Sequence, residues 1–207
     1  PMEACNLGSI NLALFVKEKN GKAEIDYADL ESVVHGAMHF LDNTIDMSVF
    51  PLPEIKKMVQ GNRKVGLGVM GFADMLYKMK LGYNTEQALD LARQIMGFIQ
   101  RTAIEASAEL AKKRGNFTNY DKSVFKESGV PRRNATCTTI APTGTLSILG
   151  NCSSGIEPLF ALSFVRNVMD NDKLVEVNPY FEAAAREGGF YSDELMERIS
   201  AEGSVHA

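Results

Sequence analysis

The chain has 207 residues, of which 45% are hydrophobic and 23% charged, and its formal net charge at pH 7 is −4. A chain of this length buries roughly 70% of its unfolded surface on folding, so its core requires neither disulfide bonds nor a metal ion. The acidic balance excludes a general attraction to nucleic acid or to an anionic membrane surface, and no apolar run reaches the roughly 20 residues that cross a bilayer.

The first part of the chain is predicted to alternate strand and helix. Residues 9–16 have the composition of a strand, and the turn residues 19–22 end it. A helix follows, whose apolar residues recur on one face, namely Leu30, Val33, Val34, Ala37, Leu41 and Ile45. Prolines within residues 50–53 break this helix, and a short helix is expected at residues 54–60.

The strongest helix pattern covers residues 85–114. Ahead of it, residues 64–71 predict a strand or strand-like turn that enters a helix at residues 72–80. Asn84 or Thr85 is suited to cap the start of the long helix, basic residues favour its C-terminal end, and a glycine stops it. Its predicted buried residues are Leu89, Ala92, Met96, Ile99, Ala103, Ala106 and Leu110.

The second half of the chain is predicted to continue the alternation. Strands are expected at residues 134–141 and 159–168, and helices at residues 146–149, 175–187 and 192–201. Strands separated by helices predict an α/β fold with mainly parallel pairing.

Gly66, Gly68 and Gly71 match the G-x-G-x-x-G pattern of a dinucleotide-binding turn. Such a site also needs an acidic residue about 20 positions later, at the end of the next strand. The acids at that distance, Glu86 and Asp90, lie inside the predicted long helix. The glycines therefore favour tight strand packing and a bend, with a dinucleotide-dependent oxidoreductase as the alternative.

A turn between a predicted strand and a short helix is a candidate phosphate site. It consists of Pro142, Thr143, Gly144, Thr145 and Leu146. Free backbone N–H groups at a helix start, together with hydroxyl groups and an unobstructed glycine, suit an anion. No lysine follows the glycine, so the turn is not a Walker A loop. A plain turn and helix cap would use the same residues, but a second glycine-rich turn at residues 153–155 favours a site.

The remaining reactive side chains give weaker signals. His35 and His39 share a helix face, yet the glutamate of H-E-x-x-H is missing and no third ligand is near, so histidines without a metal are expected. Cys5, Cys137 and Cys152 form no C-x-x-C pair, which favours a reducing cytoplasm. Taken alone, Cys5 is either an inert packing residue or a redox thiol.

Several segments together resemble the large, catalytic subunit of ribonucleotide reductase, in that family's order and approximate spacing. They are "EACNLGSINL" (3–12), "FLDNTID" (40–46), "NRKVGLGVMGFADML" (62–76), "ATCTTIAPTGTLSILGNCSSGIEP" (135–158) and "EGSVHA" (202–207). The amino-acid sequences of these segments are most similar to the adenosylcobalamin-dependent branch, as opposed to the di-iron branch.

The resemblance implies an α/β fold that is part of a ten-stranded barrel, with residues 1–207 as its C-terminal half and as a single incomplete domain. It implies an oxidoreductase that makes deoxyribonucleotides for DNA replication by radical chemistry, with adenosylcobalamin as cofactor. The implied partners are a ribonucleoside di- or triphosphate, a thioredoxin-like reductant, the rest of the large subunit and, at full length, a second copy, with no nucleic acid and no membrane.

The resemblance also assigns residues. Cys5 matches one of the two cysteines that supply electrons, and Pro142 through Leu146 match the loop that holds the substrate phosphates. The radical cysteine and the second reducing cysteine have no match here, so the isolated chain is expected to be inactive. Cys137 and Cys152 match no role. A non-catalytic half-barrel that assembles with a partner chain is a further alternative.

Overall fold

The structure is a computed structural model that describes residues 3–167, 173–203 and 205. The strands are β1 (Asn6–Asn11), β2 (Val16–Lys19), β3 (Lys22–Ile25), β4 (Val65–Met70), β5 (Ser163–Asn167) and β6 (Lys173–Val177). The α-helices are α1 (Tyr27–Met47), α2 (Pro53–Asn62), α3 (Phe72–Lys78), α4 (Glu86–Arg114), α5 (Phe125–Ser128), α6 (Gly144–Leu149), α7 (Pro179–Glu187) and α8 (Asp193–Glu202). Two short 3-10 helices, η1 (Leu12–Phe15) and η2 (Tyr120–Lys122), complete the described elements.

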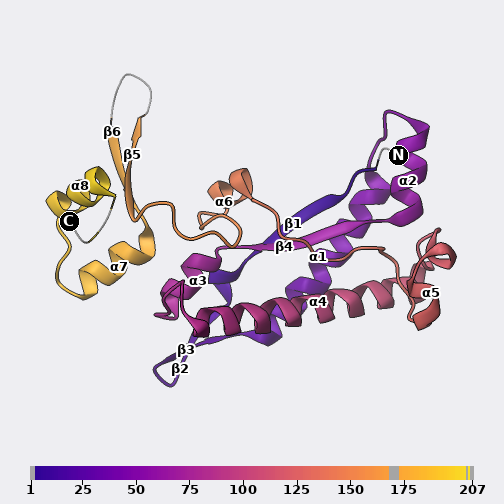
Figure 1. The fold of residues 1–207 in the computed structure, drawn as a ribbon, viewed down its shortest axis with the longest axis horizontal. Helices are drawn as coiled ribbons and strands as arrows, with labels where there is room; N and C mark the ends of the chain where they lie inside the picture. The colour runs from indigo at the N-terminus through magenta and orange to yellow at the C-terminus, as the bar shows by residue number, and fades with distance from the viewer. Residues whose placement is uncertain (1–2, 168–172, 204, 206–207) are drawn as a thin grey trace.

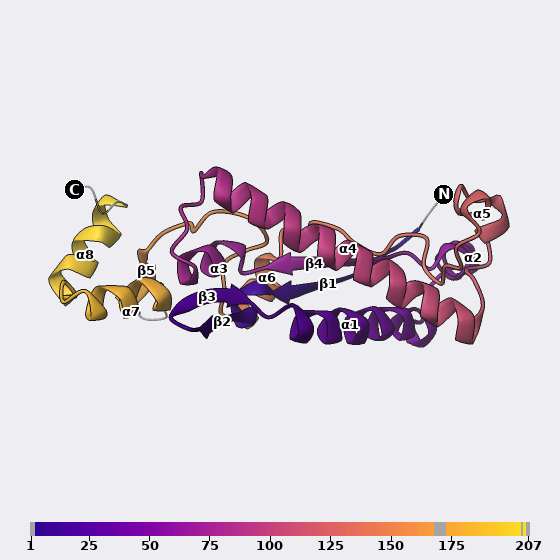
Figure 2. The same cartoon turned by 90° about the horizontal axis from the view of Figure 1, so that it is seen from below.

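The centre of the molecule is the parallel pair β1 and β4, in register from Asn6 opposite Val65 to Asn11 opposite Met70. Figures 1 and 2 show α1 and α4 along one side of this pair and α6 on the other. Side chains alternate along a strand, so Val65, Leu67 and Val69 of β4 are buried in the main core, while Gly66, Gly68 and Met70 belong to the opposite face. The α/β prediction is confirmed. Mainly parallel pairing is wrong for the described residues, because β2–β3 and β5–β6 are antiparallel hairpins.

Residues 136–139 run along the free edge of β4. The N–H of Leu67 donates to the Cys137 carbonyl at 2.8 Å, and the N–H of Thr139 donates to the Leu67 carbonyl at 3.1 Å. The predicted strand at 134–141 is nevertheless wrong as a regular element, since only one bridge, between Leu67 and Thr138, forms there. A side chain competes with the ladder, because the Thr136 hydroxyl donates to the Val65 carbonyl at 3.0 Å.

Three other predicted boundaries shift because side chains end or start elements. Asn11 accepts the Ala13 N–H and turns the chain into η1, so the predicted strand at 9–16 ends early. Asn178 caps α7, so residues 175–177 belong to β6 and not to the predicted helix. The strand predicted at 159–168 is shorter, as β5, and position 168 lies outside the described residues.

The two long helices bury slightly different faces from those predicted. Val33 is 39% exposed and Met38 is fully buried, so the buried face of α1 is rotated away from Val33. In α4, Leu89 is 47% exposed while Ala88 is buried. Of the two predicted caps of α4, the structure has Thr85, whose hydroxyl oxygen accepts the Ala88 N–H.

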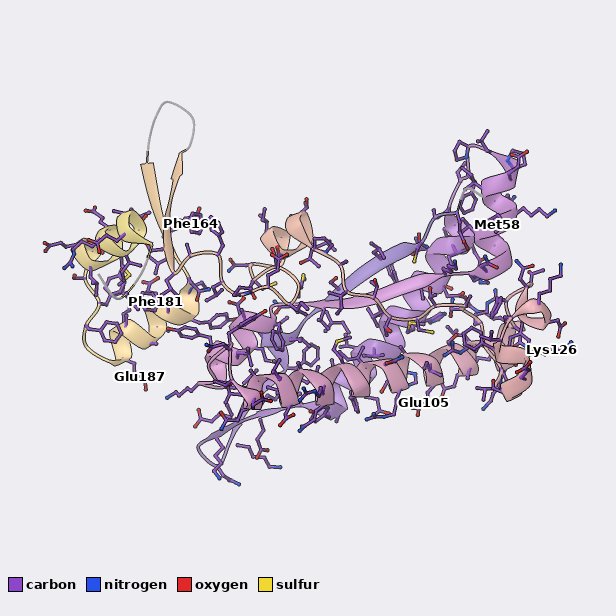
Figure 3. The ribbon with its side chains drawn as sticks, in the orientation of Figure 1. Met58, Glu105, Lys126, Phe164, Phe181 and Glu187 are labelled. Carbon is purple, nitrogen blue, oxygen red and sulfur yellow. The ribbon has the colours of Figure 1, made fainter. Side chains whose placement is uncertain are left out.

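A second, smaller hydrophobic cluster lies at one end of the molecule, where α7 and α8 bury Phe181, Ala185, Met196 and Ile199. In Figure 3, Phe164 and Phe181 lie at this end, and Met58 and Lys126 lie at the other. None of the helices in the described part of the chain has the length and apolar character needed to span a bilayer.

Asp42 on α1 is fully buried and joins four segments of the chain. Its carboxylate accepts hydrogen bonds from Arg63 at 2.9 Å, Asn134 at 3.0 Å, Arg114 at 3.1 Å and Arg133 at 3.4 Å. A buried charge is costly unless it is paired and hydrogen-bonded, and this carboxylate is both. The cluster therefore ties α1 to the end of α2, the end of α4 and the start of the segment beside β4.

The glycines of β4 are required by close packing. A Cβ at Gly68 would lie 2.9 Å from the Thr139 carbonyl oxygen, and one at Gly66 would lie 2.8 Å from the side chains of Leu7 and Thr139. Gly71 has φ +70° and starts α3. The packing and bend interpretation is confirmed. A dinucleotide site is not supported, because two of the glycines lie inside a covered strand.

We expect Gly68→Ala to destabilise the protein by about 1–3 kcal/mol, because its Cβ has no space against a backbone oxygen. The matched variant is Gly36→Ala, where a Cβ meets no heavy atom within 4 Å. It should stabilise helix α1 by about 1 kcal/mol. Urea unfolding of both variants measures the difference, and equal effects would contradict the packing argument.

We expect Arg63→Met to lower the free energy of unfolding by about 3–5 kcal/mol, because Asp42 loses its main buried partner. The control is Arg93→Met, whose pair with Asp90 is exposed and worth under about 1 kcal/mol.

Arg63 also lowers the pKa of Asp46, so that part of the stability is present at neutral pH and is lost as pH falls through the lowered pKa. Between neutral and acidic pH, the free energy of unfolding should therefore fall less in Arg63→Met than in the wild type. Unfolding curves recorded across this pH range measure the difference.

Candidate functional site

The turn before α6 has a strained backbone. Thr143 adopts φ 58° and ψ 26°, a left-handed conformation that is rare for a β-branched residue. Such strain costs on the order of 1–3 kcal/mol and persists only where the surroundings enforce it. Here the Thr143 side chain is buried, and its hydroxyl oxygen accepts the Gly155 N–H at 2.7 Å.

The first turn of α6 presents free N–H groups. Gly144, Thr145 and Leu146 open the helix, so their N–H groups have no acceptor within it, and all three residues are exposed. A Cβ at Gly144 would meet no heavy atom within 4 Å, so the backbone there is accessible. Pro142 is also exposed and fixes the chain direction entering the turn. This arrangement fits an anion.

The second glycine-rich turn, residues 153–155, lies against the first. The hydroxyl groups of Ser154 and Ser147 are 3.0 Å apart. The Gly71 N–H donates to the Ser153 carbonyl at 2.8 Å, at the C-terminal end of β4. The structure therefore brings both predicted turns together where parallel strands end, a position where α/β folds often bind ligands.

A cavity of about 470 Å³ opens beside these turns. Asp74, to which no sequence motif assigns a role, lies in its wall and is only 1% exposed. Its carboxylate accepts the Ser153 N–H at 2.6 Å and the Asn178 amide at 3.2 Å. The one sequence signal was an acid within the otherwise apolar residues 72–76.

Cys137 and Cys152 are poor nucleophiles in this structure. Burial and the charge of Asp74 raise the pKa of the Cys152 thiol to about 11. Burial also raises the pKa of Cys137, which lies in the main core. Since the thiolate is the reactive form, the raised pKa makes both thiols less reactive near neutral pH than an ordinary cysteine.

Cys5 lies one residue before β1, at the opposite end of the strand from the phosphate-site turn. It is exposed, and its Sγ donates to the Asn6 carbonyl at 3.6 Å. Partial burial raises its pKa, while the ammonium of Lys64, itself 2.9 Å from a Glu3 oxygen, opposes the rise. β1 has six residues, so Cys5 and the far end of β1 are separated by about 20 Å along the strand.

The two histidines of α1 form no metal site. His35 pairs with Glu109 at 3.6 Å, and His39 contacts Arg114 at 2.9 Å. Within the described ranges, no three His, Cys, Asp or Glu side chains gather in a way that could hold a metal ion.

Comparison with known proteins gives a consistent result. The family described as "Ribonucleotide reductase, barrel domain" matches residues 2–131 and 125–207. The vitamin B12-dependent ribonucleoside-diphosphate reductase of Thermoplasma acidophilum is 49% identical over 99% of this chain and 26% of its own length. That of Mycobacterium tuberculosis (strain CDC 1551 / Oshkosh) is 45% identical over 99% of this chain and 29% of its own length.

A solved structure has the same fold. The class Id ribonucleotide reductase alpha subunit of Actinobacillus ureae superposes with a TM-score of 0.74 at 28% identity, over 97% of this chain and 35% of that one. The chain thus spans between a quarter and a third of the length of the two vitamin B12-dependent reductases named above.

We expect Lys64→Met to raise the pKa of Cys5 further, because it removes the charge that favours the thiolate. Alkylation by iodoacetamide at about pH 8 should slow several-fold in a Cys137→Ala, Cys152→Ala background. Glu3→Gln should act in the opposite direction. Lys19→Met, on the β2–β3 hairpin, is the control, and an unchanged rate in Lys64→Met would contradict the electrostatic account.

Proposed function

Because this chain belongs to the ribonucleotide reductase barrel-domain family, we propose that it forms the C-terminal half of the catalytic barrel of a ribonucleoside-diphosphate reductase. The whole enzyme converts ribonucleotides to deoxyribonucleotides. A diphosphate substrate is favoured over a triphosphate, since the relatives that are 45–49% identical are named diphosphate reductases.

The observation that carries the proposal is the turn before α6. Strain at Thr143 is retained at a position where the next three residues are exposed and their N–H groups have no acceptor within the helix. We assign the substrate phosphates to these groups, on Gly144, Thr145 and Leu146, with Pro142 setting the direction of the chain. Anion binding of this kind uses the helix dipole and the free N–H groups together.

Cys5 supplies electrons in this proposal. Reduction replaces the 2′-hydroxyl of the ribose by hydrogen, releases that hydroxyl as water, and oxidises two thiols to a disulfide. Cys5 is one thiol, and a cysteine outside this chain is the other. A thioredoxin-like dithiol then reduces the disulfide by exchange. Cys137 lies in the main core and takes no part in this exchange.

Adenosylcobalamin is the proposed cofactor, since the relatives that share 45–49% identity are named vitamin B12-dependent. Bound to the whole enzyme, it supplies the radical that starts the reaction. We assign no residue of this chain to the cofactor.

The proposed setting is a reducing cytoplasm, because the redox cysteine must return to the thiol form. A full-length subunit that pairs as a homodimer and serves DNA replication completes the proposal. The net charge of −4 gives no support for nucleic acid as a partner.

We expect Gly144→Val in the full-length reductase to raise the KM for CDP by about tenfold or more, because its side chain occupies the space proposed for phosphate. Gly36→Val is the matched control, since both glycines have open surroundings. Steady-state kinetics with adenosylcobalamin and dithiothreitol provide the measurement. An unchanged KM in Gly144→Val would remove the phosphate assignment.

A further inference from the structure

Asp74 carries a buried carboxylate to which the proposed chemistry assigns no task. It belongs to the first turn of α3 and is 1% exposed. A carboxylate placed there must be stabilised by hydrogen bonds, since burial of an unpaired charge is costly. Its two oxygens accept from different parts of the chain, Ser153 and Asn178.

The contact between Asp74 and Ser153 is reciprocal. The Ser153 N–H donates to the Asp74 carboxylate at 2.6 Å, and the Asp74 N–H donates to the Ser153 hydroxyl at 3.3 Å. The Ser153 carbonyl accepts the Gly71 N–H at 2.8 Å. All three polar groups of Ser153 are thus held by the junction of β4 and α3.

The turn that starts at Ser153 reaches the phosphate-site turn two residues later. The Gly155 N–H donates to the Thr143 hydroxyl oxygen at 2.7 Å, and the Ser154 hydroxyl lies 3.0 Å from that of Ser147 on α6. Gly155 has φ +45°, and a Cβ there would lie 3.0 Å from the Ala141 carbonyl oxygen. Through these hydrogen bonds, the position of α3 fixes the position of the strained residue, Thr143.

The second oxygen of Asp74 faces the C-terminal part of the chain. The Asn178 amide donates to it at 3.2 Å, while the Asn178 carbonyl oxygen caps α7 by accepting the N–H groups of Tyr180 and Phe181. Lys78, one helical turn after Asp74, lies over the Tyr180 ring at 5.7 Å. Asp74 thus fixes the phosphate-site turn on one side and α7 on the other.

We propose that Asp74 is a positioning residue for phosphate binding: it holds Ser153 so that Gly155 keeps Thr143 left-handed and the N–H groups of α6 aligned toward substrate. The inference rests on the proposed function and names a residue that acts through others, without touching the substrate. Loss of the carboxylate would weaken binding of the ground state and the transition state alike.

The test is Asp74→Asn in the full-length reductase. Asparagine keeps the size but has one acceptor oxygen, so its NH₂ group must face a donor from Ser153 or Asn178. We expect the KM for CDP to rise about tenfold while kcat changes less than about threefold. A purely structural role would lower the fraction of folded enzyme, and therefore kcat, without raising KM.

Asp29→Asn is the matched control, because Asp29 is also an acid in the first turn of a helix but is exposed. Hydrogen exchange adds a second readout: the N–H groups of Ser153 and Gly155 should exchange faster in Asp74→Asn, and those of β1 should not. If Asp74→Asn does not fold, Ser153→Ala removes the hydroxyl contact alone, and we expect KM to rise about threefold.

Wild-type turnover together with an unchanged KM in Asp74→Asn would overturn the positioning role and leave the proposed function intact. In the Ser153→Ala experiment an unchanged KM has the same meaning. Absence of turnover by the wild-type enzyme would overturn the proposed function, and an unchanged KM in Gly144→Val would overturn the phosphate assignment. Either result would remove this inference as well.

Discussion

The buried carboxylate of Asp42 is the interaction on which the rest of the structure depends. Asp42 belongs to α1, and the end of α2, the end of α4 and residues 133–134 each supply side-chain donors to its carboxylate. Because Asn134 is fixed there, the chain enters the edge of β4 at one register. The position of the residues that follow along that edge, including the phosphate-site turn, therefore depends on this cluster.

The second constraint is the missing side chains at Gly66 and Gly68. They let residues 136–139 approach β4 closely, so that the next residues arrive at the C-terminal end of the parallel pair. The strained Thr143 then directs the first turn of α6 outward. Cys5 and the turn before α6 therefore lie toward opposite ends of the β1–β4 pair.

Much of the fold could be predicted from the sequence, because periodicity and capping are local. The long helix α4, its Thr85 cap, the breaks around α2 and the packing role of the β4 glycines all agree with the structure. The boundaries at Asn11 and Asn178 shifted through local caps, whereas the strand predicted at 134–141 failed because of contacts distant in sequence. Residues 134–141 have a strand's composition, but the Asn134 amide donates to Asp42 and the Thr136 hydroxyl donates to the Val65 carbonyl. Because these side chains form the bonds, no regular ladder forms.

The sequence by itself determined the family and the α/β class. It also selected Cys5 as a candidate redox thiol and the Thr143 turn as a candidate phosphate site, since residue types and spacing carry that information. Only the tertiary structure decided that the turns at 143 and 153 meet, that Cys5 lies at the other end of β1, and that Asp74 joins the site to α7. The physical reason is that a buried carboxylate acquires a role through its hydrogen-bond donors. Those of Asp74 are 79 and 104 residues away along the chain.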